Sequence, residues 1–97
     1  MQGSKALRRA AVLIGHFRAR VRSMIQELDT VVLTRDIPAE RLRKGDLGAV
    51  VFVHQDGAAY EVEFVTLDGQ TLALVALPAD AVRAATGREL PHAREVA

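Results

Sequence analysis

The sequence predicts a mainly β protein, a small β-barrel preceded by an N-terminal amphipathic α-helix. The chain has 97 residues, which is room for one small domain. From about residue 26 onward, short apolar runs alternate with turn signals at a spacing of roughly ten residues, which is typical of a β-meander. The first part of the chain instead repeats apolar side chains every three or four positions. We therefore assign residues 1–25 to a helix or extension and residues 26–97 to the barrel.

The N-terminal segment carries the apolar stripe of an amphipathic helix. The stripe consists of Leu7, Ala10, Ile14, Phe17, Val21 and Met24. An isolated helix of this length is marginal in water, so we expect the stripe to pack on something. Three alternatives remain open: the protein's own sheet or a second copy, a groove on a different protein, and nucleic acid or an anionic membrane. Leu7, Ile14, Phe17 and Val21 are the candidate partner contacts, and Met24 is an alternative start that would make the helix an extension.

Charge is divided unevenly between the two segments. The first 24 residues hold six basic and no acidic side chains, whereas the remaining 73 hold seven basic and twelve acidic ones. Arg18, Arg20 and Arg22 would be the nucleic-acid contacts, but they do not share one helical face. Because the acidic barrel would repel phosphate, we place nucleic-acid binding second, as the alternative to protein binding.

Several classes of protein are disfavoured by composition. The absence of cysteine excludes a disulfide framework, a thiolate metal site and a cysteine nucleophile. No apolar run reaches the roughly 20 residues of a transmembrane helix. The apolar stretch over 10–14 is also shorter than the core of a secretory signal, and arginines follow it. We therefore expect a cytoplasmic protein without a membrane span.

The first two strands follow from β-branched residues and turn signals. Residues 30–34 are rich in valine and threonine and predict the first strand. Pro38 prevents strand pairing in the connection that follows, where one helical turn is expected over 39–42. The second strand is predicted over 47–54, with its hairpin turn at 55–57.

The rest of the barrel is predicted from a further hairpin. The third strand is expected over 58–66 and the fourth over 70–77, joined by Asp68-Gly69, a strong hairpin signal. One helical turn is expected over 79–84, and a short last strand within 88–96 would complete the barrel.

The strands differ in how their side chains alternate. The third strand places Tyr60, Val62 and Phe64 on one face and two glutamates on the other, the ordinary pattern of core and solvent. The second and fourth strands are apolar on both faces, so one face needs a cover or forms an interaction site. We expect the helix or a second copy to supply that cover. The candidate partner contacts on the strands are Val50, Phe52, Glu61, Glu63 and Val75.

An ordered run of motifs resembles the bacterial domain of unknown function 4926 family over roughly residues 26–84. The run comprises Leu28–Thr34, Ile37-Pro38, Leu42–Val51, Gly57, Tyr60–Phe64, Asp68–Thr71 and Leu77. The resemblance implies a Src-homology-3-like or KOW-like small barrel. It also associates the chain with accessory or immunity-type partners encoded beside bacterial toxins. Residues 1–24 and the tail from Gly87 depart from the family pattern, so it implies nothing about them.

No catalytic, metal or cofactor site is predicted. His16, His54 and His92 lack metal-ligand spacing. Glu61 and Glu63 point the same way from one strand and could pair as acids or hold a cation, but a solvated face that attracts a basic partner is the more ordinary interpretation. Serine occurs only at positions 4 and 23, without a nucleophile motif. The run over 45–48 lacks the spacing of a phosphate loop, as well as its lysine.

The sequence therefore favours a non-catalytic protein-interaction module, whose partner is another protein, such as the product of a neighbouring gene, or a second copy. A nucleic-acid-binding barrel is the alternative. In either case we expect Gly48 to allow strands to approach closely, so that Gly48→Val lowers thermal stability.

Overall fold

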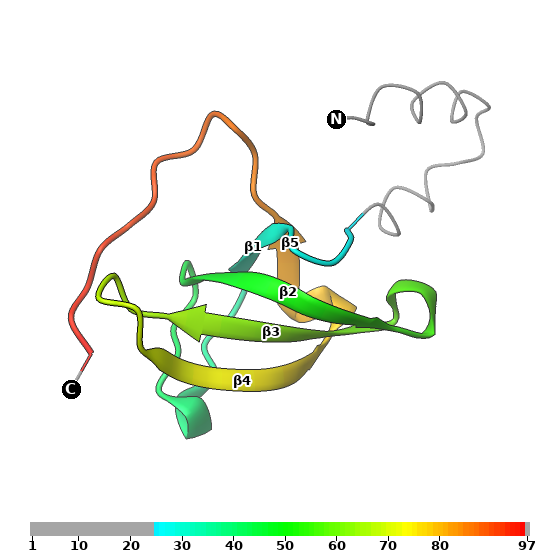
Figure 1. Cartoon of the computed structure of the whole chain (residues 1–97), viewed down its shortest axis with the longest axis horizontal. Helices are drawn as coiled ribbons and strands as arrows, with labels where there is room; N and C mark the ends of the chain where they lie inside the picture. Colours follow the sequence, from blue (N-terminus) through cyan, green and yellow to red (C-terminus); the bar gives the residue numbers. More distant parts are fainter. Residues whose placement is uncertain (1–24, 97) are drawn as a thin grey trace.

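Five antiparallel β-strands form one sheet within residues 25–96, the part of the chain that this computed structural model describes (Figure 1). The strands are β1 (Thr30–Leu33), β2 (Leu47–His54), β3 (Ala59–Val65), β4 (Thr71–Pro78) and β5 (Val82–Ala84). Their order across the sheet is β4-β3-β2-β1-β5. The mainly β prediction is confirmed, and β2 has the predicted bounds.

The two hairpin turns lie where the sequence predicts them. A 3-10 turn at Gln55–Gly57 joins β2 to β3, and the Asp68-Gly69 pair lies in the turn between β3 and β4. Gly69 has a φ of 90°, a left-handed conformation that glycine adopts without a Cβ clash. A second 3-10 turn, Pro38–Glu40, stands in the connection where one helical turn was expected.

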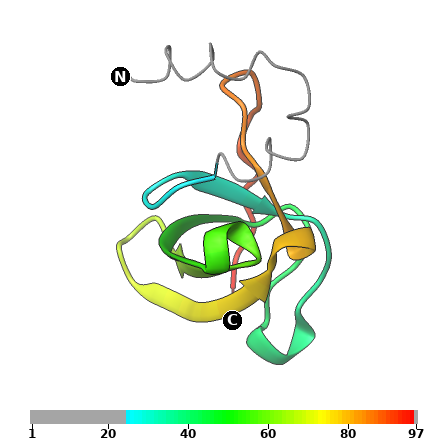
Figure 2. The ribbon, with the colours of Figure 1, turned by 90° about the vertical axis from the view of Figure 1, so that its right-hand side faces the viewer.

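β2 is the strand on which the sheet bends. Its first residues pair with β1, from Leu47 opposite Val32 to Ala49 opposite Thr30. From Ala49 to His54 it pairs with β3, and the register shifts between Val50 and Phe52. Such a bulge increases local twist and bends the strand. One long strand therefore serves both halves of the sheet, which curls strongly in the end-on view of Figure 2.

The core fills the concave side of this curled sheet. The predicted inward face of β3 is confirmed, because Tyr60, Val62 and Phe64 are all at most 3% exposed. Each large side chain buried in this way contributes about 1.5–3 kcal/mol of hydrophobic stabilisation. The other strands and their connections complete the cluster with Val31, Leu33, Leu42, Val50, Ala73, Leu77, Ala81 and Val82.

Gly48 lies where β2 passes closest to the core side chains of β3. A Cβ atom built at this position would lie 2.5 Å from Cγ1 of Val62 and 2.8 Å from Cε2 of Phe64. Real Cβ atoms do not approach heavy atoms so closely, and both neighbours are themselves packed in the core. The geometry supports the expected destabilisation by Gly48→Val.

The expected closure into a barrel is not observed. β4 and β5 are the two edges of the sheet and do not pair with each other. Pro78 ends β4 and has no N–H to donate. The 3-10 turn Ala79–Ala81 then carries the chain to β5, which has three residues and pairs only with β1. The strand ladder is therefore open.

The last strand lies earlier in the chain than predicted. Residues 82–84, expected to belong to a helical turn, form β5, and residues 85–96 contain no strand. Val82 pairs with Leu33, and both side chains join the core. Burial of Val82 thus overrides the local helical tendency of the alanine-rich stretch.

Residues 85–96 instead form an extended segment, here called the C-terminal arm. It runs away from β5, bends, and returns past the sheet to the end of the chain (Figure 1). The predicted N-terminal helix lies outside the described residues. Within residues 25–96, no helical segment has the length and hydropathy of a transmembrane helix.

Candidate functional site

The side of β2, β3 and β4 that faces away from the core combines apolar and acidic side chains, and it is here called the outer face. Two cross-strand rows form it: Phe52 beside Glu61 and Ala76, and Ala49 beside Glu63 and Leu74. Phe52 is 46% exposed and Leu74 is 58% exposed. The outer face therefore presents large hydrophobic side chains to solvent on either side of two carboxylates.

A histidine links the two strands of the first hairpin on this face. Nε2 of His54 lies 2.9 Å from Oε2 of Glu61, and the side chains are 35% and 38% exposed. The ring of His54 also meets Phe52 edge to face, with centroids 4.6 Å apart. His54, at the end of the predicted second strand, thus belongs to the outer face. These contacts orient Phe52 and Glu61 while leaving both accessible.

The second carboxylate of the outer face has a partner on β4. Oγ1 of Thr71 donates a hydrogen bond of 2.5 Å to Oε2 of Glu63. The two glutamates therefore bind different neighbours and share none. Within residues 25–96, no three His, Cys, Asp or Glu side chains are grouped so that they could hold a metal ion.

The structure divides the predicted strand contacts between the two faces of the sheet. Phe52, Glu61 and Glu63 lie on the outer face. Val50 does not: it is 0% exposed and opposes Val62 in the core. Residues two apart on a regular strand share a face, but the bulge between Val50 and Phe52 sends their side chains to opposite faces.

Val75 is the second contact that the structure places differently. It opposes Val62 and packs half-buried against the core. The neighbouring Leu74 points outward instead, and it was not among the predicted contacts. Both faces of β4 are apolar in sequence, so alternation alone could not distinguish them. The remaining candidate residues, Leu7, Ile14, Phe17, Val21, Arg18, Arg20 and Arg22, lie outside the described residues.

A second polar centre, the Asp46 clasp, fastens the C-terminal arm to the start of β2. Oδ1 of Asp46 accepts a 2.8 Å hydrogen bond from Nε of Arg94 and lies 2.9 Å from Nε2 of His92. Oδ2 accepts hydrogen bonds from Nη2 of Arg94 (2.6 Å) and from the backbone N–H of Arg43 (2.8 Å). Arg94 also donates to the carbonyl oxygen of Arg41 at 3.0 Å.

The clasp stabilises the ionised form of Asp46. Burial by itself would raise the pKa of this carboxyl, because a charged group loses hydration. Hydrogen bonds from Arg94, the N–H of Arg43 and His92 outweigh that effect and lower the pKa of Asp46 to about 2. The carboxylate is thus a fully bonded structural anion at neutral pH.

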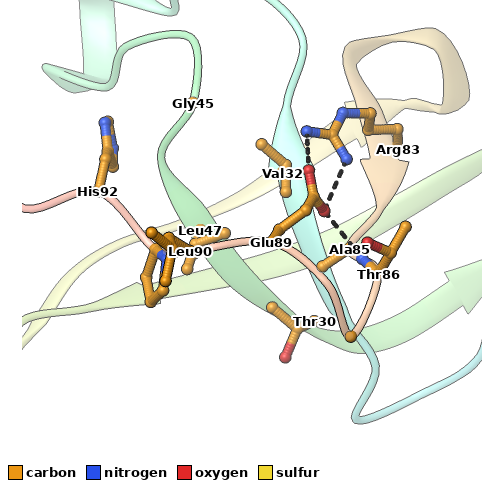
Figure 3. A pocket seen from close by; sticks show the side chains of 12 residues that line it. Thr30, Val32, Gly45, Leu47, Arg83, Ala85, Thr86, Glu89, Leu90 and His92 are labelled. Carbon is orange, nitrogen blue, oxygen red and sulfur yellow. Dashed lines mark hydrogen bonds and ion pairs between the residues drawn. The ribbon is translucent and has the colours of Figure 1, made fainter.

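A cavity of about 550 Å³ lies between the arm and strands β1 and β5 (Figure 3). Arg83 and Glu89 close one side of it through hydrogen bonds of 2.6 and 3.0 Å, and the N–H of Thr86 donates to Glu89 at 2.8 Å. The bonds from Arg83 and Thr86 lower the pKa of Glu89 to about 2. Arg83 and Glu89 are thus bonded to each other, and His92 on the opposite side is bonded to Asp46 of the clasp.

The two histidine–carboxylate pairs among the described residues have no serine or cysteine beside them. Residues 25–96 include neither serine nor cysteine. Each of the two histidine–carboxylate pairs, His54–Glu61 and His92–Asp46, therefore lacks a serine or cysteine partner to activate.

Comparison with known proteins places the chain in a family. The sequence model of the family described as domain of unknown function (DUF4926) matches residues 27–84. The chain belongs to this family. Searches of curated proteins and of solved structures returned no significant match.

The DUF4926 region contains all five strands and the whole outer face. It also contains Asp46, whereas the partners His92 and Arg94 lie in the arm, beyond the matched residues. The clasp therefore joins the family domain to a segment outside it, and the outer face is built by the family domain alone.

Proposed function

We propose that this DUF4926 protein is a non-catalytic protein-interaction module that binds its partner through the outer face. The observation that carries the proposal is the exposure of Phe52 and Leu74 beside Glu61 and Glu63. Large hydrophobic side chains on an otherwise polar surface are typical of protein-interaction sites. The family resemblance extends this proposal to an accessory or immunity-type role, in which the partner is the product of a neighbouring gene.

The chemistry of the outer face specifies the kind of partner. An aromatic side chain held by its neighbours loses little conformational entropy on binding, and such residues often dominate binding energy. The edge contact with His54 holds Phe52 in this way. The two carboxylates favour a partner that presents lysine or arginine around an apolar centre. A basic amphipathic helix has both features.

The proposal also covers the type of fold. We infer an open barrel of the Src-homology-3-like type, in which the strand order β4-β3-β2-β1-β5 wraps round one core. The shared use of β2 by both halves and the 3-10 turn between β4 and β5 support this inference.

The experiment compares two exposed hydrophobic residues. Full-length wild type, Phe52→Ser and Leu90→Ser are used to isolate partners from the host, and a captured protein is purified and titrated back by calorimetry. Leu90 is 93% exposed on the arm and serves as the matched control. We expect Phe52→Ser to lose at least about tenfold in affinity and Leu90→Ser to bind as wild type. Equal binding by all three proteins would refute the outer face as the site.

Nucleic acid is the competing outcome of this experiment. The part of the chain after residue 24 has seven basic and twelve acidic residues, so phosphate contacts would depend on the basic N-terminal segment. Capture of nucleic acid that is released by salt, and lost when Arg18, Arg20 and Arg22 become Gln, would support the alternative and overturn the protein-interaction proposal.

A further inference from the structure

The two edges of the sheet are protected to different degrees. β5 has three residues, and its Arg83 is engaged by Glu89 of the C-terminal arm. β4 has eight residues, Thr71–Pro78, and none of them is charged. Within residues 25–96, β3 is the only strand that pairs with β4, so one side of its backbone has no strand partner.

An edge strand of this kind is a template for another strand. Every second residue directs its N–H and C=O away from the sheet, and proteins usually blunt such edges with lysine, proline, bulges or short strands. On β4 the proline stands at the last position, and a bulge lies near its beginning, where Leu72 is the extra residue between the partners of Phe64 and Val65. The residues between these two features, 73–77, carry no such protection.

We propose that the free edge of β4 pairs antiparallel with β4 of a second copy, joining two sheets about a two-fold axis. An antiparallel pair places residues of one face opposite residues of the same face. With the axis at Leu74, this residue stands opposite its own copy on the outer face, and Ala73 stands opposite Val75 on the core side. Apolar side chains then meet apolar side chains along the shared edge.

Electrostatics favour a second copy as the occupant. Because β4 carries no charge, pairing it with itself brings no like charges into opposition. A two-fold arrangement also closes the assembly at two copies, which consumes both β4 edges and prevents fibre growth.

The size of the interface also requires side chains beyond the strand backbone. A stable dimer usually buries about 1,200 Å² or more in total, which is more than a short strand pair provides by its main chain alone. Leu74 on the edge, Val65 opposite Thr71 and Leu67 in the adjoining turn are 58%, 48% and 102% exposed and lie along or next to this edge. They add apolar area to that of the main-chain contact.

The first test measures the mass of the full chain by light scattering and sedimentation over a range of concentrations. We expect a dimer for wild type and for Leu90→Lys, and for Leu74→Lys a monomer that is folded at 25 °C, with the circular dichroism spectrum of wild type. Both leucines are exposed, so neither change disturbs the core. A monomeric wild type, or a dimer that survives Leu74→Lys and is lost in Phe17→Glu, would overturn the proposal.

The second test locates the contact by cross-linking. The chain has no cysteine, so each single-cysteine variant carries one thiol. We expect Leu74→Cys to form a covalent dimer with a short bifunctional thiol reagent, whereas Ala84→Cys, exposed on β5, stays monomeric under the same conditions. Equal cross-linking at both positions would count against pairing through β4.

This inference goes beyond the proposed function, and because Leu74 belongs to both the outer face and the β4 edge, Phe52→Ser is the variant that separates the two. Dimerisation is measured on the purified protein alone, without any other partner. Phe52 lies on β2, two strands in from the β4 edge, so Phe52→Ser should leave the dimer intact. A Phe52→Ser protein that becomes monomeric would place the contact on the outer face and contradict pairing at the edge.

Discussion

Asp46 and Glu61 each lie 2.9 Å from the Nε2 atom of a histidine, yet the two carboxylates have different surroundings. Asp46 is only 8% exposed and also binds the guanidinium of Arg94. The Glu61 side chain is 38% exposed and has His54 as its bonded partner on the outer face. The same local contact is therefore part of a buried network in one place and part of an accessible surface in the other.

This difference separates structural charge from charge available for recognition. A carboxylate whose oxygens are all bonded inside the chain has little capacity left for a partner, and removing it leaves buried donors unpaired. An exposed carboxylate adds little to stability, because water and salt screen its interactions. We therefore assign the Asp46 clasp to stability and the outer face to binding, and each assignment is testable.

Asp46→Asn should give the largest change. The amide keeps the size of the side chain, but it loses the charge and one acceptor oxygen that the donors of Arg94 and Arg43 require. We expect the free energy of unfolding, measured with urea, to fall by about 2–3 kcal/mol. Glu61→Gln is the matched control and should change it by less than about 0.5 kcal/mol. Equal losses in the two variants would remove the distinction between the centres.

Acid should weaken the protein through the clasp and through the Arg83–Glu89 pair. The pKa of Asp46 is lowered from an ordinary 3.8 to about 2, and that of Glu89 from 4.5 to about 2. A carboxyl with a lowered pKa contributes stability above its unfolded pKa and loses it as pH falls through the folded value.

Unfolding free energy should therefore decline between about pH 5 and pH 2, with Asp46 accounting for at most about 2 kcal/mol. The measurement is urea unfolding at a series of pH values. Asp46→Asn should show a shallower decline than wild type. Parallel curves would mean that Asp46 has the same pKa in the folded and unfolded chain.

Arg94→Lys should have a smaller and more local effect. A lysine keeps the positive charge but cannot bind both oxygens of Asp46 in the planar geometry of a guanidinium. We expect a loss of about 1 kcal/mol, together with faster amide hydrogen exchange confined to residues 85–96. Arg88→Lys is the control on the same arm. Unchanged exchange in the arm would show that other contacts hold it.

Much of this fold could be predicted because its strand faces and hairpin turns are specified by residues that are close together in the sequence. The alternation of Tyr60, Val62 and Phe64 identified the core side of β3, and the Asp68-Gly69 pair identified a hairpin. A period-two pattern and a turn dipeptide each depend on residues that are neighbours in the chain. For the same reason, the outward orientation of Glu61 and Glu63 could be predicted.

Features that depend on distant residues could not be predicted in this way. The clasp joins Asp46 to Arg94, 48 positions later, and no periodicity connects the two. The bulge that turns Phe52 outward and Val50 inward has no composition signal in an apolar run. The location of β5 was decided by pairing of Val82 with Leu33, which overrides the helical tendency of its own segment.

The smallest expected effect is the coupling between His54 and Glu61. Their contact has the same length as that between His92 and Asp46, but the two side chains are 35% and 38% exposed, so solvent competes for both partners. A double-mutant cycle with His54→Ala and Glu61→Ala should give a coupling energy below about 0.5 kcal/mol at pH 7. The parallel cycle with Arg94→Ala and Asp46→Ala should give at least about 1.5 kcal/mol. A coupling energy of similar size in both cycles would mean that Glu61 is bound to His54 as strongly as Asp46 is bound to Arg94. Glu61 would then have little capacity left for a partner.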